Sequence, residues 1–242
     1  MTDTAPALLA EIAPNATLRI GVNFGNPVIA QADPLGGAPR GVGPSLGREI
    51  ARRLGLPVAY VTYPSAGPMA DAVRLDAWDV AFLATDPARA TDIAFSAPYV
   101  VIEGTYLVHH DSPIMKVADA DREGVRIAVG DKTAYDLFLS RNLRHATLVK
   151  APTSKDAVNL FLAQGLDAAA GVRNPLAAVA AGEPRLRVIA DSYMTIGQAV
   201  GVPRARTQAA AYVAKFIDEA KRSGFVARAL SESGVSDVSV AP

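Results

Sequence analysis

The sequence predicts an α/β fold of two lobes, each a mainly parallel sheet flanked by helices, with two crossings of the chain between them. Apolar, β-rich runs alternate with helical patterns in a β-α-β-α-β order, and the same order restarts near the middle of the chain. Two long apolar segments, 99–109 and 193–202, are placed to cross between the lobes. We therefore expect lobe 1 to comprise residues 1–105 and 196–242, and lobe 2 residues 106–195.

The first β-α-β-α-β unit follows from apolar runs separated by helix signals. Ser45 is expected to cap the first helix and Gly55 to end it. Trp78 is expected to pack beneath the third strand. The predicted strands are 18–23, 58–62 and 79–84, and the predicted helices are 45–54 and 69–75.

The second unit repeats this order, and two further helices follow the second crossing. Tyr212, Phe216 and Ala220 form one row of an amphipathic helix, which Gly224 ends. We expect the C-terminal helices to return to lobe 1. The predicted strands of the second unit are 125–129, 148–151 and 166–172, its helices are 133–143 and 154–164, and the last helix is 225–232.

Composition excludes several classes of protein. Half of the 242 residues are hydrophobic, 24 basic residues balance 24 acidic ones, and there is no cysteine. A nucleic-acid binder would show a basic excess, and disulfides or Cys-ligated metals need thiols. No spacing of His, Asp and Glu is typical of zinc or calcium ligation. We therefore expect no nucleic-acid partner, no metal and no cofactor.

The N-terminal segment does not have the pattern of a secretory leader. It reads MTDTAPALLAEIAPN, with an early acid and an apolar stretch interrupted by Pro6 and Glu11. The sequence also has no run of about 18 apolar residues, so no membrane span is expected. The expected location is cytoplasmic for the chain as it stands, and periplasmic if a leader has been removed.

The segment DPARATDIAFSAPY, residues 86–99, carries a resemblance to family 3 of the bacterial extracellular solute-binding proteins. That family has a T-P-E-R-type turn followed by F-S-x-P-Y, and the matching residues fall in register without a gap. LRIGVN, AWDVAF, VRIAVGDKTAYDLFL and LDAAAG resemble further segments of the family in the same order, so that the resemblance extends from about Leu18 to Gly234.

The resemblance implies the type II periplasmic-binding-protein fold, which works as a Venus flytrap. It implies a monomer of the polar amino-acid branch that captures a small carboxylate-bearing ligand in a cleft between its lobes. The ligand would be an amino acid or a related organic acid. Its partner would be the permease of an ABC transporter, or the protein would act as a ligand carrier or sensor component.

Arg89 is the first candidate for the ligand site. Asp86 can cap a short helix that starts at Pro87, which places Arg89 in the first turn beyond the third strand. A guanidinium there can form a bidentate pair with a carboxylate, and the resemblance implies that Arg89 holds the carboxylate of the ligand. The alternative is a structural ion pair with Asp86 or Asp92.

Three further residues are candidates by position. Thr133 is expected to cap the helix after the strand 125–129, where free backbone N–H groups suit an anion. The alternative is a cap that touches no ligand. Asn23 and Phe24 follow the first strand, in a loop that lines the ligand in the family; Phe24 could equally be a packing residue.

Two positions depart from the family. Asp86 replaces the usual threonine before P-E-R, and Val172, followed by Arg173, stands where the family has the acidic residue that holds the ligand ammonium. Either Asp86 holds a ligand amine, or the ligand carries two anionic groups, one on Arg89 and one on Arg173. A solvated loop arginine is the other interpretation of Arg173.

An enzyme is the alternative function. The fold resembles that of cyclohexadienyl dehydratase, which would make the protein a cytosolic lyase acting on a small carboxylic acid. Glu103, in the first crossing, is then the candidate general acid, provided that its carboxyl is buried and its pKa raised. Otherwise Glu103 is a hinge residue hydrogen-bonded to the opposite crossing.

Overall fold

The computed structural model describes residues 6–235 and 238–242, and its contacts divide the chain into two compact units. Unit 1 takes the chain up to Val101 and again from Gly197, and unit 2 takes Ile102–Ile196. The chain passes between the units along two ten-residue strands, β5 (Val100–His109) and β10 (Met194–Pro203). The lobe boundaries predicted at 105/106 and 195/196 fall within these same two strands.

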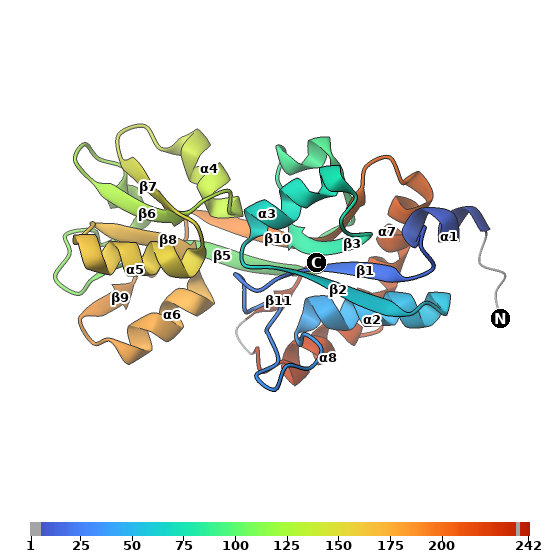
Figure 1. Ribbon diagram of the computed structural model, residues 1–242. Helices are drawn as coiled ribbons and strands as arrows, with labels where there is room; N and C mark the ends of the chain where they lie inside the picture. The colour runs from blue at the N-terminus through green and yellow to red at the C-terminus, as the bar shows by residue number, and fades with distance from the viewer. Residues whose placement is uncertain (1–5, 236–237) are drawn as a thin grey trace. The chain divides into compact units, whose positions relative to one another are not determined.

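Unit 1 is built on a sheet in which the predicted parallel strands are joined by antiparallel ones (Figure 1). Its other strands are β1 (Leu18–Asn23), β2 (Val58–Tyr63), β3 (Val80–Ala84), β4 (Ile93–Phe95) and β11 (Ser239–Val240). β1 pairs in parallel with β2 and β3, whereas β10 runs antiparallel to β3 and β4. The carboxyl ends of β1 and β3 therefore lie at one edge of the sheet, where the loops that follow them come together.

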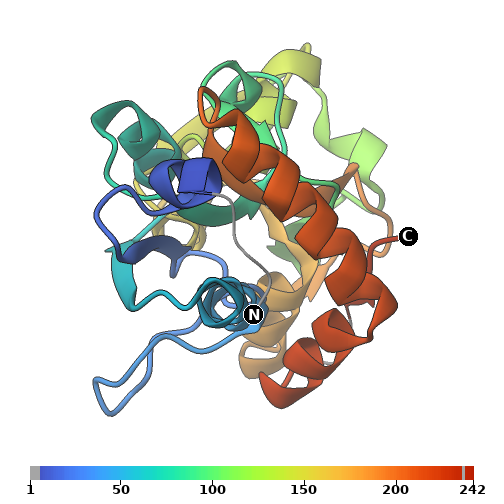
Figure 2. The same ribbon diagram turned by 90° about the vertical axis from the view of Figure 1, so that its right-hand side faces the viewer.

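Helices from both chain segments of unit 1 pack around it. They are α1 (Pro6–Ile12), α2 (Val42–Leu54), α3 (Ala66–Asp71), α7 (Thr207–Arg222) and α8 (Phe225–Glu232), with short 3₁₀ turns η1 (Ala72–Leu75) and η2 (Arg89–Thr91). α1 packs on α7, and α2 packs on α8 (Figures 1 and 2). No helix in the described part of the chain is both long and apolar enough to cross a membrane.

Two helix starts in unit 1 differ from the prediction. α2 begins at Val42, with Gly41 as its N-cap, so Ser45 is not the cap. α3 begins at Ala66 and ends at Asp71, and the predicted helix 69–75 continues only as the 3₁₀ turn η1. Gly55 does end α2, in the left-handed conformation that glycine adopts without steric cost.

The core of unit 1 beneath β3 is centred on Trp78, as predicted. Its side chain is fully buried in a cluster with Met69, Leu83 and Ile93. The indole Nε1 donates a hydrogen bond of 2.8 Å to the backbone oxygen of Met69, so the polar atom of this large side chain is satisfied inside the core.

Unit 2 has the same strand-helix alternation. Its remaining strands are β6 (Arg126–Gly130), β7 (Thr147–Ala151), β8 (Ala168–Val172) and β9 (Leu186–Val188), and its helices are η3 (Val117–Ala120), α4 (Ala134–Asn142), α5 (Ser154–Gln164) and α6 (Arg173–Gly182). β6 pairs in parallel with β7 and β8, and β5 runs antiparallel to β8 and β9. Phe161 of α5 is fully buried and packs with Leu107 and Leu166.

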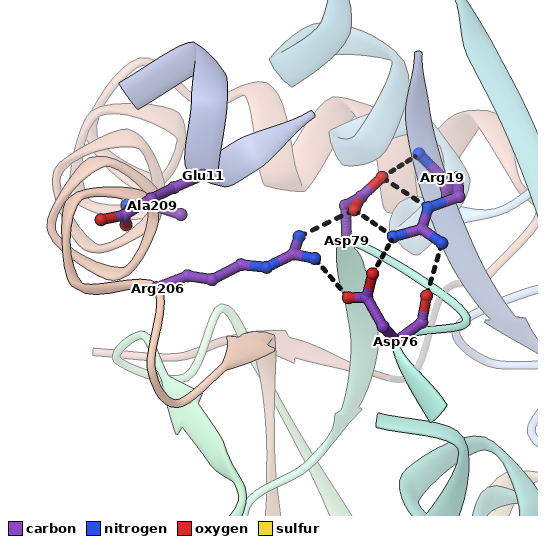
Figure 3. A network of polar contacts seen from close by, with 6 residues as sticks. All are labelled: Glu11, Arg19, Asp76, Asp79, Arg206 and Ala209. Atoms are coloured by element: carbon purple, nitrogen blue, oxygen red, sulfur yellow. Dashed lines mark hydrogen bonds and ion pairs between the residues drawn. The ribbon is translucent and has the colours of Figure 1, made fainter. Parts of the chain in front are cut away.

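A four-residue ion-pair network ties unit 1 together at the amino ends of β1 and β3 (Figure 3). The Asp79 side chain is 0 % exposed and lies 2.7 Å from both Arg19 Nη2 and Arg206 Nη1. Asp76, which is 59 % exposed, completes the network with both arginines. The hydrogen bond to Asp79 is the main reason that the pKa of Arg19 is raised above its ordinary value. We call these residues the Asp79 network.

Glu11 of α1 supports the start of α7 beside this network. Its Oε2 accepts hydrogen bonds from the backbone N–H groups of Gln208, at 2.7 Å, and Ala209, at 3.1 Å. These groups belong to the first turn of α7, which has no cap from its own N-cap residue. A carboxylate at a helix N-terminus satisfies these unpaired donors and is favoured by the helix dipole.

Candidate functional site

Arg89 lies directly beyond β3, at the start of η2, and its side chain is buried in unit 1. The residue is only 6 % exposed. Its Nη1 donates a hydrogen bond of 2.9 Å to the backbone oxygen of Ala84, the last residue of β3. Burial lowers the pKa of Arg89 to about 10, and the charges of Asp86 and Asp71 oppose this effect. The guanidinium therefore stays charged at neutral pH, held against the carboxyl end of a central strand.

Asp86 is the neighbour that the sequence analysis paired with Arg89. It is also buried, and its Oδ1 accepts a hydrogen bond of 2.8 Å from the backbone N–H of Ala88. The predicted helix cap is not found, because the helical turn is a short 3₁₀ turn that begins at Arg89, with Ala88 as its N-cap. The Asp86 carboxylate instead fixes the turn that precedes it, through its bond to the backbone two residues later. A buried carboxylate and a buried guanidinium three residues apart give this turn both signs of charge.

Asn23 and Phe24 follow β1, the strand next to β3. The Asn23 Oδ1 accepts a hydrogen bond of 2.8 Å from the backbone N–H of Gly25, which fixes the turn. The backbone N–H of Phe24 donates to the oxygen of Tyr63 at 3.0 Å, and the Phe24 side chain is only partly buried. Because β1 and β3 are parallel neighbours, Asn23 and Arg89 come from loops at the same sheet edge.

In unit 2, Thr133 caps α4 as predicted. Its hydroxyl accepts a hydrogen bond of 3.1 Å from the backbone N–H of Asp136 and donates one of 2.8 Å to the oxygen of Gly130, the last residue of β6. The hydroxyl is buried and serves both as a hydrogen-bond donor and as an acceptor. The first turn of α4 is thereby fastened to the carboxyl end of a central strand of unit 2.

The acid in this first turn is itself part of a small polar cluster. The Asp136 side chain is fully buried and accepts hydrogen bonds from the backbone N–H of Lys132 and from the Ser140 hydroxyl. Lys150 Nζ lies 3.0 Å from Asp136 and 3.1 Å from Asp131. Both carboxylates raise the pKa of Lys150, with the hydrogen bond to Asp136 as the largest cause. The cluster keeps the α4 N-terminus in place.

Arg173 is not the loop arginine that the sequence suggested, because it is the first residue of α6. Its Nε lies 2.6 Å from Glu103 Oε2. Its two terminal nitrogens donate to the backbone oxygens of Ile189, Ala190 and Asp191, each at 3.0 Å. Most of its hydrogen-bonding capacity is therefore used within unit 2, on the segment that leads into β10.

Sheet register explains the pairing of Glu103 with Arg173. Gly104 of β5 lies opposite Val172 of β8 in the antiparallel ladder, so Glu103 comes level with Arg173 at the end of β8. The Glu103 side chain is 47 % exposed, and the buried carboxyl expected for a general acid is not found. Glu103 is bonded to the residue after β8, and this pair was missed by sequence reasoning because nothing in the sequence specifies the register.

A second contact holds the same segment. A Cβ on Gly104 would lie 2.7 Å from a ring carbon of Tyr193, so only glycine allows this close approach. The Tyr193 ring also packs on Tyr106, with centroids 4.7 Å apart. Arg173 and Gly104 together fix residues 189–193 beside the carboxyl end of β8.

Comparison with known proteins agrees with the fold and identifies the family. Residues 18–232 match the family described as bacterial extracellular solute-binding proteins, family 3. No curated protein matches the chain. Many solved structures do match it. The three described next are 20–22% identical to the chain, so their similarity shows the fold alone.

Three of these structures differ in what they are named for. A mutant of ArgBP from T. maritima is 21% identical, with a TM-score of 0.80, covering 95% of this chain and 100% of its own. The solute receptor for L-cysteine of Neisseria gonorrhoeae is 22% identical, with a TM-score of 0.81 and coverages of 93% and 92%. An ancestral amino acid-binding protein, AncCDT-1, described as a precursor of cyclohexadienyl dehydratase, is 20% identical, with a TM-score of 0.77 and coverages of 93% and 97%.

Proposed function

Because the chain belongs to family 3 of the bacterial extracellular solute-binding proteins, we propose that it binds a small carboxylate-bearing ligand through Arg89. The ligand is an amino acid or a related organic acid. The observation that carries the proposal is the buried guanidinium of Arg89 at the carboxyl end of β3. Removing a charged group from water is costly, and a carboxylate bound by the guanidinium fork would offset that cost.

The charges of the η2 turn favour a zwitterion. Asp86 and Arg89 place a carboxylate and a guanidinium three residues apart, both buried. A free amino acid presents the complementary charges, with its carboxylate toward Arg89 and its ammonium toward Asp86. The ArgBP and L-cysteine receptor structures are named for such ligands. Val172 stands where the family has the acid that holds the ligand ammonium. The charges of the η2 turn support the hypothesis that Asp86 holds the ligand amine in its place.

The contacts of Arg173 disfavour the second hypothesis, in which the ligand carries two anionic groups. Glu103 neutralises the Arg173 guanidinium, and three backbone oxygens use most of its remaining donors. A second anion at Arg173 would have to displace these partners. We therefore propose that Arg173 positions residues 189–191, and that monocarboxylate amino acids bind more tightly than dicarboxylic acids without an amine.

The partner and the location belong to the same proposal. A monomeric protein that delivers its ligand to an ABC permease works outside the cytoplasm, whereas a cytoplasmic protein would be a ligand carrier or sensor component. Fractionation of the source cells distinguishes these alternatives. Recovery in the periplasmic or secreted fraction supports delivery to a permease, and recovery with cytoplasmic markers supports the carrier or sensor.

A thermal-shift screen tests the proposed ligand class. The panel contains free amino acids, dicarboxylates, keto acids and cyclohexadienyl acids. A ligand at 100 times its Kd should add about 2.7 kcal/mol to the free energy of unfolding, a clear rise in Tm. Each ligand is then recovered and analysed by mass spectrometry. Intact amino acid supports a binding protein; a chemically changed ligand would instead support the dehydratase-like enzyme, and an amino-acid panel without any shift would contradict the proposal.

A matched pair of threonine variants tests the second candidate in unit 2. Thr133 caps α4 and Thr153 caps α5, each accepting from the backbone N–H of the aspartate three residues later at 3.1 Å. Loss of either cap, in Thr133→Ala or Thr153→Ala, should cost about 1 kcal/mol of stability. If the α4 N-terminus contacts the ligand, only Thr133→Ala should also weaken ligand binding in calorimetry, by about tenfold.

Equal ligand affinities in the two threonine variants would assign Thr133 to capping alone. That outcome would leave the Arg89 proposal intact, because Arg89 belongs to unit 1 and is tested separately. Loss of binding in both variants, with a matching loss of helix signal, would show that the substitutions act through the fold of unit 2.

A further inference from the structure

A groove lined by arginines runs between α2 and α8 of unit 1. It consists of two adjoining hollows of about 250 Å³ and 230 Å³. Both are lined by Ser45 and Arg48 of α2 and by Ala229 and Glu232 of α8. Arg228 and Arg52 line the first hollow, and Arg40 lines the second. We call this surface the arginine groove; neither Arg89 nor the loop after β1 that carries Asn23 and Phe24 lines it.

Arg48 at the centre of the groove is held by neutral groups. Its Nη1 donates to the backbone oxygen of Pro39 at 3.0 Å and to the Tyr60 hydroxyl at 3.2 Å, and its Nη2 donates to Ser45 Oγ at 3.0 Å. Its contacts with the described residues include no carboxylate. The guanidinium is therefore held in a fixed orientation while its positive charge is not neutralised, which is the arrangement that an anion-binding arginine requires.

The loop and helix that border the second hollow are also fixed. Gln31 and Arg40 pair through both backbone hydrogen bonds, at 2.8 and 2.9 Å. The Gln31 side chain donates to the backbone oxygen of Ser233, beyond the end of α8, at 3.4 Å. These contacts close the loop 31–40 against the α8 end of the groove.

The acidic residues of the groove compensate only part of its charge. Glu49 is engaged by Arg52 Nε at 2.7 Å and by Arg53 Nε at 2.9 Å. The hydrogen bond from Arg52 is the largest cause that lowers the pKa of Glu49, to about 2. Glu49 thus already pairs with these two arginines, and among the described lining residues only Glu232 opposes the positive charges of Arg40, Arg48 and Arg228.

We propose that the arginine groove binds a dianionic phosphoryl group. Three guanidiniums against one carboxylate leave two positive charges, which match a phosphate dianion or a phosphate monoester rather than a monocarboxylate. The hollows are smaller than the 300–1,000 Å³ of ordinary ligand pockets, a size that suits one tetrahedral group. Arginine forks bind phosphate oxygens in pairs, which adds orientation to charge. This site is independent of the ligand proposed for Arg89.

The phosphoryl group has two possible sources, and direct binding measurements separate them. Inorganic phosphate and glycerol 3-phosphate are titrated into the full-length protein by calorimetry. Vesicles of phosphatidic acid in phosphatidylcholine, and of phosphatidylcholine alone, are tested by co-sedimentation. Binding of the soluble phosphates identifies a free metabolite, and binding only of phosphatidic acid vesicles identifies a lipid headgroup. Binding of none of the phosphate probes overturns the proposal.

Three variants test whether the arginine groove is the site. Arg48→Gln should weaken binding about tenfold, because a charge-assisted hydrogen bond is lost. Glu232→Gln should tighten binding severalfold, because it removes the repulsive carboxylate. Arg222→Gln is the matched control: it removes the same charge from an exposed position at the end of α7, where the arginine Nε donates to the backbone oxygen of Asp218, and should leave the affinity unchanged.

Two patterns of results would contradict the arginine groove. Equal weakening by Arg48→Gln and Arg222→Gln would indicate attraction by overall charge, and weaker binding of Glu232→Gln would give the wrong sign. Arg228→Gln serves in place of Arg48→Gln if the loss of three hydrogen bonds prevents that variant from folding. The thermal shift with an Arg89 ligand should be the same in every groove variant, which keeps the two sites separate.

Discussion

Replacing Asp79 with alanine is expected to lower the free energy of unfolding of unit 1 by about 3 kcal/mol, because it leaves two mostly buried arginine side chains without their shared carboxylate. Asp79 Oδ2 also accepts from the backbone N–H of Arg19 at 2.8 Å. The loss is placed at the low end of the range for buried pairs because Arg19 and Arg206 keep Asp76 as a partner. Tm should fall by roughly 6–12 °C in calorimetry.

Asp76→Ala is the matched control for the Asp79 network. It removes the same charge from the same two arginines, but the Asp76 side chain is largely exposed. Exposed ion pairs contribute about 0–1 kcal/mol, so this variant should lose far less stability. Added salt should reduce the loss of unfolding free energy in Asp76→Ala. It should hardly change the loss in Asp79→Ala, since buried ion pairs are screened less. Equal losses in the two variants would contradict a buried network centred on Asp79.

The Asp79 network also shows a limit of sequence reasoning. Arg206 is separated from Asp79 by 127 positions, and the two residues meet only because the chain returns from unit 2 to unit 1 along β10. No local pattern marks such a contact. The same holds for Glu103 and Arg173, which the register of β5 against β8 brings together. Long-range polar pairs of this kind are therefore visible only in the structure.

The longer strands and the bounds of α5 and α8 were predictable because local signals agreed with the fold, whereas the short strands β4, β9 and β11 were not predicted. α5 spans Ser154–Gln164 as predicted, with Thr153 as its N-cap and Gly165 in the left-handed conformation at its end. α8 likewise spans Phe225–Glu232 after Gly224. At these helices the apolar periodicity and the cap residues indicate the same ends, and the tertiary contacts favour those ends as well.

Three of the helix starts that were missed share one feature, a proline as the third residue of the helix. Pro44, Pro68 and Pro175 are each the third residue of their helices, α2, α3 and α6. The predicted starts of the first two helices, Ser45 and Met69, come directly after the proline, and α6 was not predicted. Proline has no N–H, but the first-turn N–H groups have no partner within the helix, so proline is tolerated there. For the same reason, neither of the two interpretations of Arg173 placed it at the start of a helix.

The position of Arg89 was predictable and its burial was not. DPARATDIAFSAPY marks the turn after β3, and the structure places Arg89 there with its guanidinium bonded to Ala84. Sequence alone left open a structural ion pair with Asp86 or Asp92, and of these Asp92 pairs with Arg74 at 2.8 Å. Asp86 remains close enough to act on Arg89 electrostatically. What the sequence could not supply was the exclusion of water around the guanidinium.

Arg89→Met is expected to reduce affinity for the ligand found in the thermal-shift screen by roughly 3 kcal/mol, a factor of about 150 in Kd. The physical reason is that a buried, water-excluded guanidinium binds a carboxylate through two charge-assisted hydrogen bonds, which methionine cannot replace. Arg89→Lys keeps the charge but loses the fork, so its Kd should rise by an intermediate factor of about ten. Titration calorimetry measures both values on the same preparation.

Stability separates this effect from misfolding, because Arg89 also bonds to the end of β3. The Tm of each variant without ligand is measured first, and Ser96→Ala is the control for the same segment. Ser96 is buried beside η2, where its hydroxyl donates to Ala97 and accepts from the backbone N–H of Val200. Ser96→Ala should lower Tm by losing these bonds while ligand affinity stays within about threefold. If Arg89→Met folds, and binds the ligand as tightly as Ser96→Ala does, the carboxylate is held elsewhere and the proposed site is wrong.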